Sequence, residues 1–445
     1  MKKALPISIL LLSSLAMFAS KTYVSTAREI SSRIWEASDT VVMKNGAWVD
    51  QVIKFRARGT SEHPALLIAE EPGSVILKGD SRLELSGDFG TVSGLLFKEG
   101  SPSRKSVVEF MKDASNCRVT NTKIDSYNPD DVKRDYKWVS INGKQNRVDH
   151  CSFINKYHMG TLMVVWLDTA VVSPSHVIDH NHFGYRRSVL DEKGKELNGQ
   201  EIIRVGNSGT SMVTANCLVE NNYFERCDGE VECISNKSCG NTYRGNLFFE
   251  VSGGLTLRHG NSCLVEKNTF IGNGKPRTAG IRVIGENHTV KNNYLENITG
   301  NGFYSAICVM RGKIDPPLYD YFQVKNLTLT GNVLINCKEA LNVSFHNSRP
   351  EYILPPVNTR ISCNLIYNTD KNNIGIAIGK RFKEMDITWT DNYLNEGQLI
   401  DFSSKDVTWI KGNLPEAFPI GKCENSGKPL KPRAISSDQV GVNWK

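Results

Sequence analysis

The chain has 445 residues, of which 40% are hydrophobic and 23% are charged, and its formal net charge is +7. This length and apolar content suffice for a large buried core and exclude an intrinsically disordered chain. The positive excess is not gathered into a run of Lys and Arg, so it favours a polyanionic partner only weakly.

The N-terminus resembles a secretory signal peptide, because Met1-Lys2-Lys3 precedes an apolar run from Ala4 to Ala19. We expect a signal peptide within residues 1–27, cleaved near Ala19 or Ala27, and therefore a periplasmic or secreted protein. An exported protein meets acidic glycans more often than nucleic acid. The apolar run is short for a membrane span, so we expect no membrane insertion. Most of the eleven cysteines lie in apolar strand patterns, which predicts buried thiols more than a disulfide framework.

A repeat organises most of the chain: a short β-rich run, then Asn, one residue and an apolar residue. The markers Asn222, Asn246, Asn268 and Asn293 lie 24, 22 and 25 residues apart. The other copies carry Asn181, Asn332, Asn364 and Asn392, with weaker copies near Asn121 and Cys151.

This period, with alternating Val, Ile, Thr, Tyr and Phe and no helical pattern, predicts an all-β, single-stranded, right-handed parallel β-helix, a solenoid whose coils stack on one another. We expect its catalytic domain over residues 28–420, with first coils and a cap before residue 110, and an irregular tail over 421–445. The marker asparagines are expected to stack along the axis and to take the left-handed conformation at bends. Longer intervals predict inserted loops that wall a groove.

The charged residues of the central repeats predict a site. Glu230 and Glu232 lie two apart and should share one face of a strand. Lys237 follows beyond an expected bend, and Arg258 lies about one coil later. Arg282 lies 24 residues after Arg258 and is expected to extend the basic column by another coil.

Three segments of the chain together resemble polysaccharide lyase family 6, which contains alginate lyases and chondroitinase B. The resemblance covers about residues 30 to 420. The segments are Asn198-Gly-Gln-Glu201-Ile-Ile-Arg204-Val-Gly206, Glu230-Val-Glu232-Cys-Ile-Ser-Asn-Lys237 and Leu257-Arg258-His259-Gly260.

The resemblance implies roles for individual residues. It implies that Asn198, Glu230 and Glu232 bind Ca²⁺, that Lys237 is the general base, and that Arg258 is the catalytic arginine. His259 and Arg282 match substrate-contacting positions. These roles suit the removal of a C5 proton from a uronic acid, because a cation and an arginine neutralise the neighbouring carboxylate, and nearby positive charge favours the neutral lysine.

We therefore predict an enzyme that cleaves alginate, an acidic polysaccharide, by β-elimination at the 4-O-glycosidic bond. The proton donor to O4 stays open among Arg258, water and a tyrosine. Three alternatives remain: a dermatan sulfate lyase like chondroitinase B, a uronate C5-epimerase, and a glycan-binding β-helix without activity.

Overall fold

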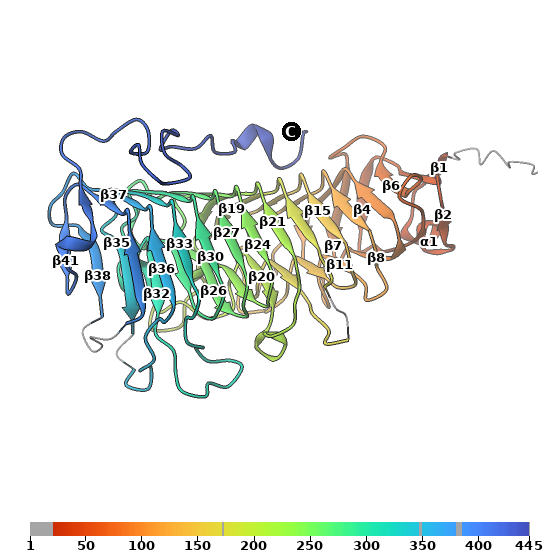
Figure 1. Ribbon diagram of the computed structural model, residues 1–445. Helices are drawn as coiled ribbons and strands as arrows, with labels where there is room; N and C mark the ends of the chain where they lie inside the picture. The colour runs from red at the N-terminus through yellow and green to blue at the C-terminus, as the bar shows by residue number, and fades with distance from the viewer. Residues whose placement is uncertain (1–20, 171–172, 347–348, 380–384, 445) are drawn as a thin grey trace, which may run out of the picture.

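The protein is a parallel β-helix. The computed structural model describes residues 21–170, 173–346, 349–379 and 385–444. Their strands form three sheets of 14 parallel strands each, and each coil of the chain contributes one strand to each sheet (Figure 1). The predicted all-β solenoid is confirmed. Among the described residues, no helix is long and apolar enough to cross a membrane.

The strands of each sheet follow the order of the coils. The first sheet consists of β1 (Lys21–Val24), β3 (Thr40–Met43), β6 (Ala65–Ala69), β9 (Gly90–Ser93), β12 (Arg118–Thr120), β15 (Arg147–Asp149), β18 (Val177–Asp179), β21 (Leu218–Glu220), β24 (Thr242–Arg244), β27 (Leu264–Glu266), β30 (Thr289–Lys291), β33 (Thr328–Thr330), β36 (Thr359–Ser362) and β39 (Ile387–Thr390). The second sheet consists of β4 (Gly46–Val49), β7 (Val75–Gly79), β10 (Leu95–Gly100), β13 (Lys123–Asp125), β16 (Ser152–Ile154), β19 (His182–Arg186), β22 (Tyr223–Cys227), β25 (Leu247–Phe249), β28 (Thr269–Ile271), β31 (Tyr294–Glu296), β34 (Val333–Ile335), β37 (Leu365–Tyr367), β40 (Tyr393–Leu394) and β42 (Thr408–Trp409). The third sheet consists of β2 (Trp35–Glu36), β5 (Val52–Arg58), β8 (Arg82–Asp88), β11 (Val108–Phe110), β14 (Val139–Ile141), β17 (Met163–Val165), β20 (Ile203–Gly206), β23 (Glu232–Lys237), β26 (Gly253–His259), β29 (Thr278–Val283), β32 (Ile307–Met310), β35 (Glu339–Phe345), β38 (Ile374–Ile378) and β41 (Gln398–Ile400). Short helices are α1 (Ala27–Ser31), η1 (Ser208–Thr210), η2 (Gly302–Tyr304), η3 (Ser404–Asp406) and η4 (Ser437–Gln439).

The folded domain begins before the predicted boundary at residue 28. Strand β1 pairs in parallel with β3, and Thr26 caps α1 with its side chain. Ile30 of α1 is fully buried, and its carbonyl accepts a hydrogen bond from the buried indole of Trp35. This short helix covers apolar surface of the first coils. Most of the predicted signal peptide, residues 1–20, lies outside the described residues.

The marker asparagines form the predicted ladder inside the solenoid. Each amide nitrogen donates to the amide oxygen one coil further on, at 2.9 to 3.0 Å, from Asn181 to Asn392. The backbone conformation was predicted wrongly. The left-handed residue is the one before the marker, such as Asn221 at φ 52° or Lys267 at φ 56°. The bend therefore precedes each ladder amide, whose side chain then points inward.

Replacement of Asn246 by alanine is expected to lower the free energy of unfolding by about 2–3 kcal/mol. Its amide oxygen accepts from the buried backbone N–H of Asn222, and its amide nitrogen donates to the carbonyl of Val219. Both groups lose a partner in the buried interior. Chemical denaturation measures the change, and exposed Asn301 replaced by alanine is the control. Equal midpoints for the two variants would contradict a stabilising ladder.

Aromatic rings and thiols fill the interior beside this ladder. Phe153, Phe183, Phe224, Phe248 and Phe270 stack in consecutive coils with ring centroids 4.3 to 5.3 Å apart. Nine described cysteines are free thiols, and all but one of them are buried, as their apolar strand patterns predict.

The C-terminal tail is ordered against the solenoid. After β42 it runs back along the outside of the coils (Figure 1) and is joined to them by a disulfide between Cys363 and Cys423. At its end, Asn443 and Trp444 donate to the side chain and the carbonyl of Asn121. Apart from η4, the described tail residues after 420 form no helix or strand, so the predicted irregular tail is a strap along the coils.

Replacement of Cys423 by serine is expected to release this tail and to lower stability by about 2–4 kcal/mol, because the disulfide closes a long loop. Hydrogen exchange should rise over residues 424–444 and stay unchanged in the central coils. The matched control is Cys239→Ser, which removes an unpaired thiol. Unchanged exchange in the tail would mean that its other contacts suffice to hold it.

Candidate active site

Three carboxylates gather on the third sheet at the centre of the solenoid. Oxygen atoms of Glu201, Glu230 and Glu232 all lie within 4.8 Å of one another, and the three side chains are buried. Glu201 lies two residues before β20, and Glu232 is the first residue of β23, so the carboxylates come from neighbouring coils. We call these three residues the carboxylate triad. Three oxygen ligands at this spacing fit a hard divalent cation.

The pKa values of Glu230 and Glu232 in the triad are shifted in opposite directions. Burial, together with the charges of Glu201 and Glu232, raises the pKa of Glu230 to about 8. Two backbone N–H groups, of Gly199 and Gln200, donate to Glu230 at 2.8 and 3.3 Å but do not offset this effect. The negative form of Glu230 is therefore disfavoured without a counter-charge, and a cation bound among the three carboxyl groups would stabilise it.

The pKa of Glu232 is lowered. Burial raises its pKa, but the positive charges of Arg282, Lys237 and Arg258 outweigh burial, so the pKa lies below its ordinary value. Arg282 is buried and forms an ion pair with Glu232. Arg258 Nε lies 3.9 Å from the same carboxylate oxygen. Glu232 therefore links the triad to the arginines of the next two coils.

Lys237 lies beside the triad, with its Nζ 3.7 Å from Glu201 Oε1 and its side chain 19% exposed. The predicted bend before Lys237 is wrong, because Lys237 is the last residue of strand β23. The register shifts between Asn236 and Lys237, so Lys237 pairs with His259. This shift brings Lys237 and Arg258 to the same end of two adjacent strands.

The predicted basic column is also wrong in register. Arg282 pairs with Thr256 on one side and with Cys308 on the other, so it does not continue a column from Arg258. Irregular pairing between β23, β26 and β29 causes the offset. The substrate contact expected of Arg282 stays a prediction.

Arg258 is held by a loop that follows β32. Its guanidinium lies 4.3 Å from the ring centroid of Tyr321, and its Nη2 donates to the carbonyl of Tyr319 at 3.2 Å. Tyr321 in turn stacks on Tyr352 with centroids 4.9 Å apart. The buried Nη1 of Arg258 has no hydrogen-bond partner among the described residues.

His259 is a buried, neutral imidazole. Burial, assisted by the charges of Arg258 and Lys237, lowers its pKa to about 3. Its Nε2 lies 3.5 Å from the hydroxyl of Ser208 in η1, and its Nδ1 has no hydrogen-bond partner within the described ranges. His259 therefore offers a neutral polar group beside Lys237.

Asn198 lies on the inserted loop between β19 and β20, and its side chain is exposed. Glu196 of this loop forms a bidentate ion pair with Arg277, with both distances 2.7 Å. This pair joins the loop to the turn before β29. The loop lies over Glu230 through its backbone, whereas the ligand role of the Asn198 side chain stays a prediction.

The structure thus brings together Glu230, Glu232, Lys237 and Arg258, as the sequence predicts. Two residues were missed. Glu201 belongs to the triad although its segment alone gives no sign of this, and Tyr321 supports Arg258 from a loop 61 to 63 residues downstream. Only the spacing of Glu201, 29 residues before Glu230 and close to one coil plus a short insertion, could have indicated its position.

The site of this parallel β-helix therefore combines buried carboxylates, a lysine and an arginine on one sheet. Comparison with known proteins defines the class further. The family model described as chondroitinase B matches residues 24–411. A comparison with curated proteins finds no match.

The similar solved structures include the following three. A polysaccharide lyase family 6 alginate lyase, AlyGC, has 35% identity and a TM-score of 0.87 over 96% of this chain, and the chain spans 59% of its length. A mannuronic acid specific family 6 lyase from human gut microbiota has 30% identity and a TM-score of 0.78, with 88% of this chain and 91% of that chain covered. The family 6 lyase Pedsa3628 from Pseudopedobacter saltans has 27% identity and a TM-score of 0.77, with coverages of 95% and 99%.

The chain belongs to the chondroitinase B family and to polysaccharide lyase family 6. The predicted family membership is confirmed.

Proposed function

We propose that this protein cleaves alginate by β-elimination at the 4-O-glycosidic bond of a uronic acid. The proposal is supported most by the grouping of Lys237 and Arg258 at the ends of adjacent strands, beside a buried carboxylate triad. Two similar structures, an alginate lyase and a mannuronic acid specific lyase, favour alginate as the substrate.

In the proposed reaction Lys237 takes the proton from C5 of the uronic acid. The resulting negative charge spreads into the uronate carboxylate, where the positive charge of Arg258, whose side chain is partly exposed, stabilises it. The bond between C4 and the glycosidic oxygen then breaks, a double bond forms between C4 and C5, and the departing oxygen receives a proton. His259 and Arg282 are proposed to contact the substrate around this position.

We propose that Glu230, Glu232 and Asn198 hold Ca²⁺, with Glu201 as a further ligand. The cation, when bound, supplies positive charge that neutralises the substrate carboxylate. The crowding of three buried carboxyl groups supports this assignment, since burial beside Glu201 and Glu232 raises the pKa of Glu230 and a bound cation would relieve their repulsion. Export of the protein to the periplasm or medium is proposed on the N-terminal sequence alone.

Ultraviolet absorbance of the unsaturated product tests the function. Purified protein should produce this absorbance with alginate. Dermatan sulfate is tested in parallel, because the matching family model is described as chondroitinase B. If the absorbance rises with dermatan sulfate and not with alginate, dermatan sulfate replaces alginate as the proposed substrate. Its absence with both polymers, together with a change in the uronate epimer ratio, would favour an epimerase, and binding without either change would favour a binding protein.

Replacement of Tyr321 by leucine is expected to lower kcat about tenfold, because Arg258 loses the ring 4.3 Å from its guanidinium. Tyr321→Phe keeps the ring and should retain most activity. Initial rates with alginate measure both variants. A loss in Tyr321→Phe as large as in Tyr321→Leu would instead assign the tyrosine hydroxyl to the proton transfer.

A further inference from the structure

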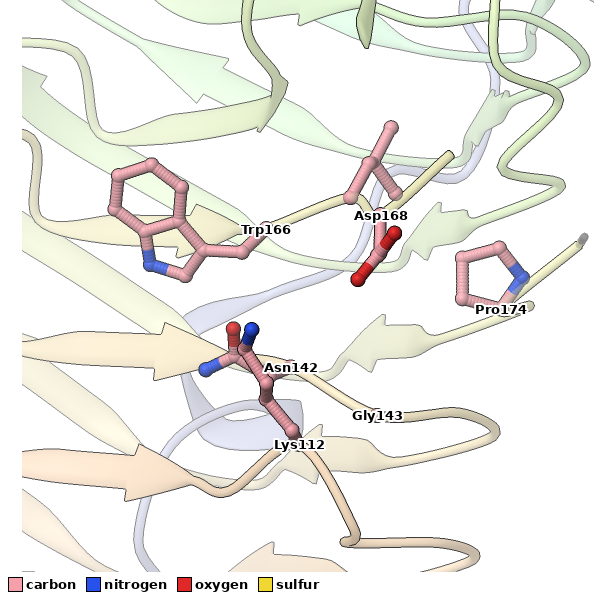
Figure 2. A pocket seen from close by; sticks show the side chains of 7 residues that line it. Lys112, Asn142, Gly143, Trp166, Asp168 and Pro174 are labelled. Atoms are coloured by element: carbon pink, nitrogen blue, oxygen red, sulfur yellow. The ribbon is translucent and has the colours of Figure 1, made fainter. Parts of the chain in front are cut away.

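The outer face of the third sheet is hollowed in the coils of β11, β14 and β17, which precede the coils of the carboxylate triad. Two adjoining pockets of about 300 and 460 Å³ share the side chains of Asn142 and Trp166. Figure 2 shows Trp166, Asn142 and Asp168 around the smaller pocket. The reaction scheme proposed above does not use either pocket.

Trp166 is fixed at the boundary of the two pockets. Its indole N–H donates to the hydroxyl of Ser140 at 3.0 Å, and that hydroxyl lies 2.7 Å from the hydroxyl of Ser106. The ring is therefore oriented from the coil before its own. A fixed aromatic ring in an open pocket provides a flat apolar face for a ligand.

Arg204 lies beside this ring without an anionic partner. Its guanidinium carbon is 5.4 Å from the Trp166 ring centroid. Its side chain is half-buried, and its buried Nε has no hydrogen-bond partner among the described residues. No ion pair with Arg204 is found in the described part of the chain either, whereas Arg258 and Arg282 both lie against Glu232. A half-buried guanidinium with unused donors is suited to an external carboxylate.

The strand register connects Arg204 and Trp166 to Lys237. Arg204 pairs with Val164 on one side and with Ser235 on the other, and Gly206 pairs with Lys237. Arg204 therefore lies one coil before the strand of Lys237, and Trp166 follows the strand one coil earlier still. Neighbouring strands are about 4.8 Å apart, so an extended sugar chain that passes Lys237 along the sheet reaches Arg204 and then Trp166.

We propose that Trp166 and Arg204 form a subsite for a further uronate residue of the acidic polysaccharide, outside the pair of sugars joined by the cleaved bond. The indole packs on the C–H face of the sugar, and the guanidinium binds its carboxylate. This inference rests on the proposed function for the identity of the polymer. It adds a binding position that favours long chains over short ones.

The test compares alginate hexasaccharide with trisaccharide as substrates. A trisaccharide can fill the reacting position from the side of Arg258 without reaching Trp166. Arg204→Ala and Trp166→Leu should each lower the ratio of kcat/KM for hexasaccharide to that for trisaccharide about tenfold, mainly through KM, because each removes one contact to the distant sugar. Arg360→Ala, an exposed arginine of the first sheet, is the matched control and should leave the ratio unchanged.

A binding measurement separates this inference from the proposed reaction. Tryptophan fluorescence of Lys237→Ala is titrated with alginate hexasaccharide, with and without Arg204→Ala. Weaker binding in the double variant supports the subsite even if the wild-type protein forms no unsaturated product. An unchanged ratio and unchanged binding overturn the subsite, also when lyase activity is present. An equal loss of kcat/KM for both oligosaccharides also overturns the subsite, because such a loss indicates a structural role of the replaced residue. In that case Arg204→Lys, which retains the positive charge, should not recover the lost kcat/KM.

Discussion

Replacement of Lys237 by alanine is expected to abolish product formation from alginate while binding is retained. Lys237 Nζ is the one amine at the triad within the described residues, and Arg258 lies on the adjacent strand. A positioned general base contributes about 10²–10⁴-fold to a rate. We therefore expect kcat to fall by at least about 10³-fold, measured by ultraviolet absorbance of the unsaturated product.

Lys237→Arg is the informative second variant, because arginine retains the positive charge but does not act as a base near neutral pH. It should be as inactive as Lys237→Ala. The matched control is Lys291→Ala, which removes a lysine paired with Glu266 on the first sheet and should keep full activity. Substantial activity in Lys237→Arg would show that charge, not proton abstraction, is what position 237 supplies.

The fold was predictable because the same local requirement recurs in every coil. Each repeat needs an inward-pointing amide that bonds to the next coil, and the marker asparagines reveal this spacing directly. The positions of the left-handed φ angles were not predictable, since the residue type before the marker differs from coil to coil, as in Asn221, Lys267 and Cys363. Several residue types fulfil that backbone role, so no single residue marks it.

The positions of site residues were predictable where these residues lie within or next to regular strands. They were not predictable where an inserted loop or a shift in strand register determines the position. Glu230 to Arg258 span little more than one coil, so their order in the sequence largely determines their proximity. Glu201 and Tyr321 reach the site from insertions whose paths depend on tertiary contacts, such as the ion pair of Glu196 with Arg277. Arg282 was misplaced because one irregular pairing shifts all later residues of the strand.

Removal of divalent cations by a chelator is expected to abolish activity, and added Ca²⁺ should restore it. The triad places three carboxylates within 4.8 Å of one another, and Glu230→Gln should weaken Ca²⁺ binding by at least about tenfold. Glu220→Gln is the matched control, because Glu220 pairs with Arg244 on the first sheet. Full activity in chelator would remove the cation from the proposal and leave Arg258 as the neutralising group.

The affinity for Ca²⁺ should also rise as the pH rises toward about 8. Burial beside Glu201 and Glu232 raises the pKa of Glu230 to about 8 in the protein without metal. Below this value the carboxyl is mostly protonated and the cation must displace a proton, so the apparent Kd should improve about tenfold for each pH unit as pH rises toward 8 and then level off. Calorimetry in buffers of different ionisation enthalpy measures the released proton. In Glu230→Gln the proton release should disappear, and a wild-type affinity independent of pH would show that the cation binds without Glu230.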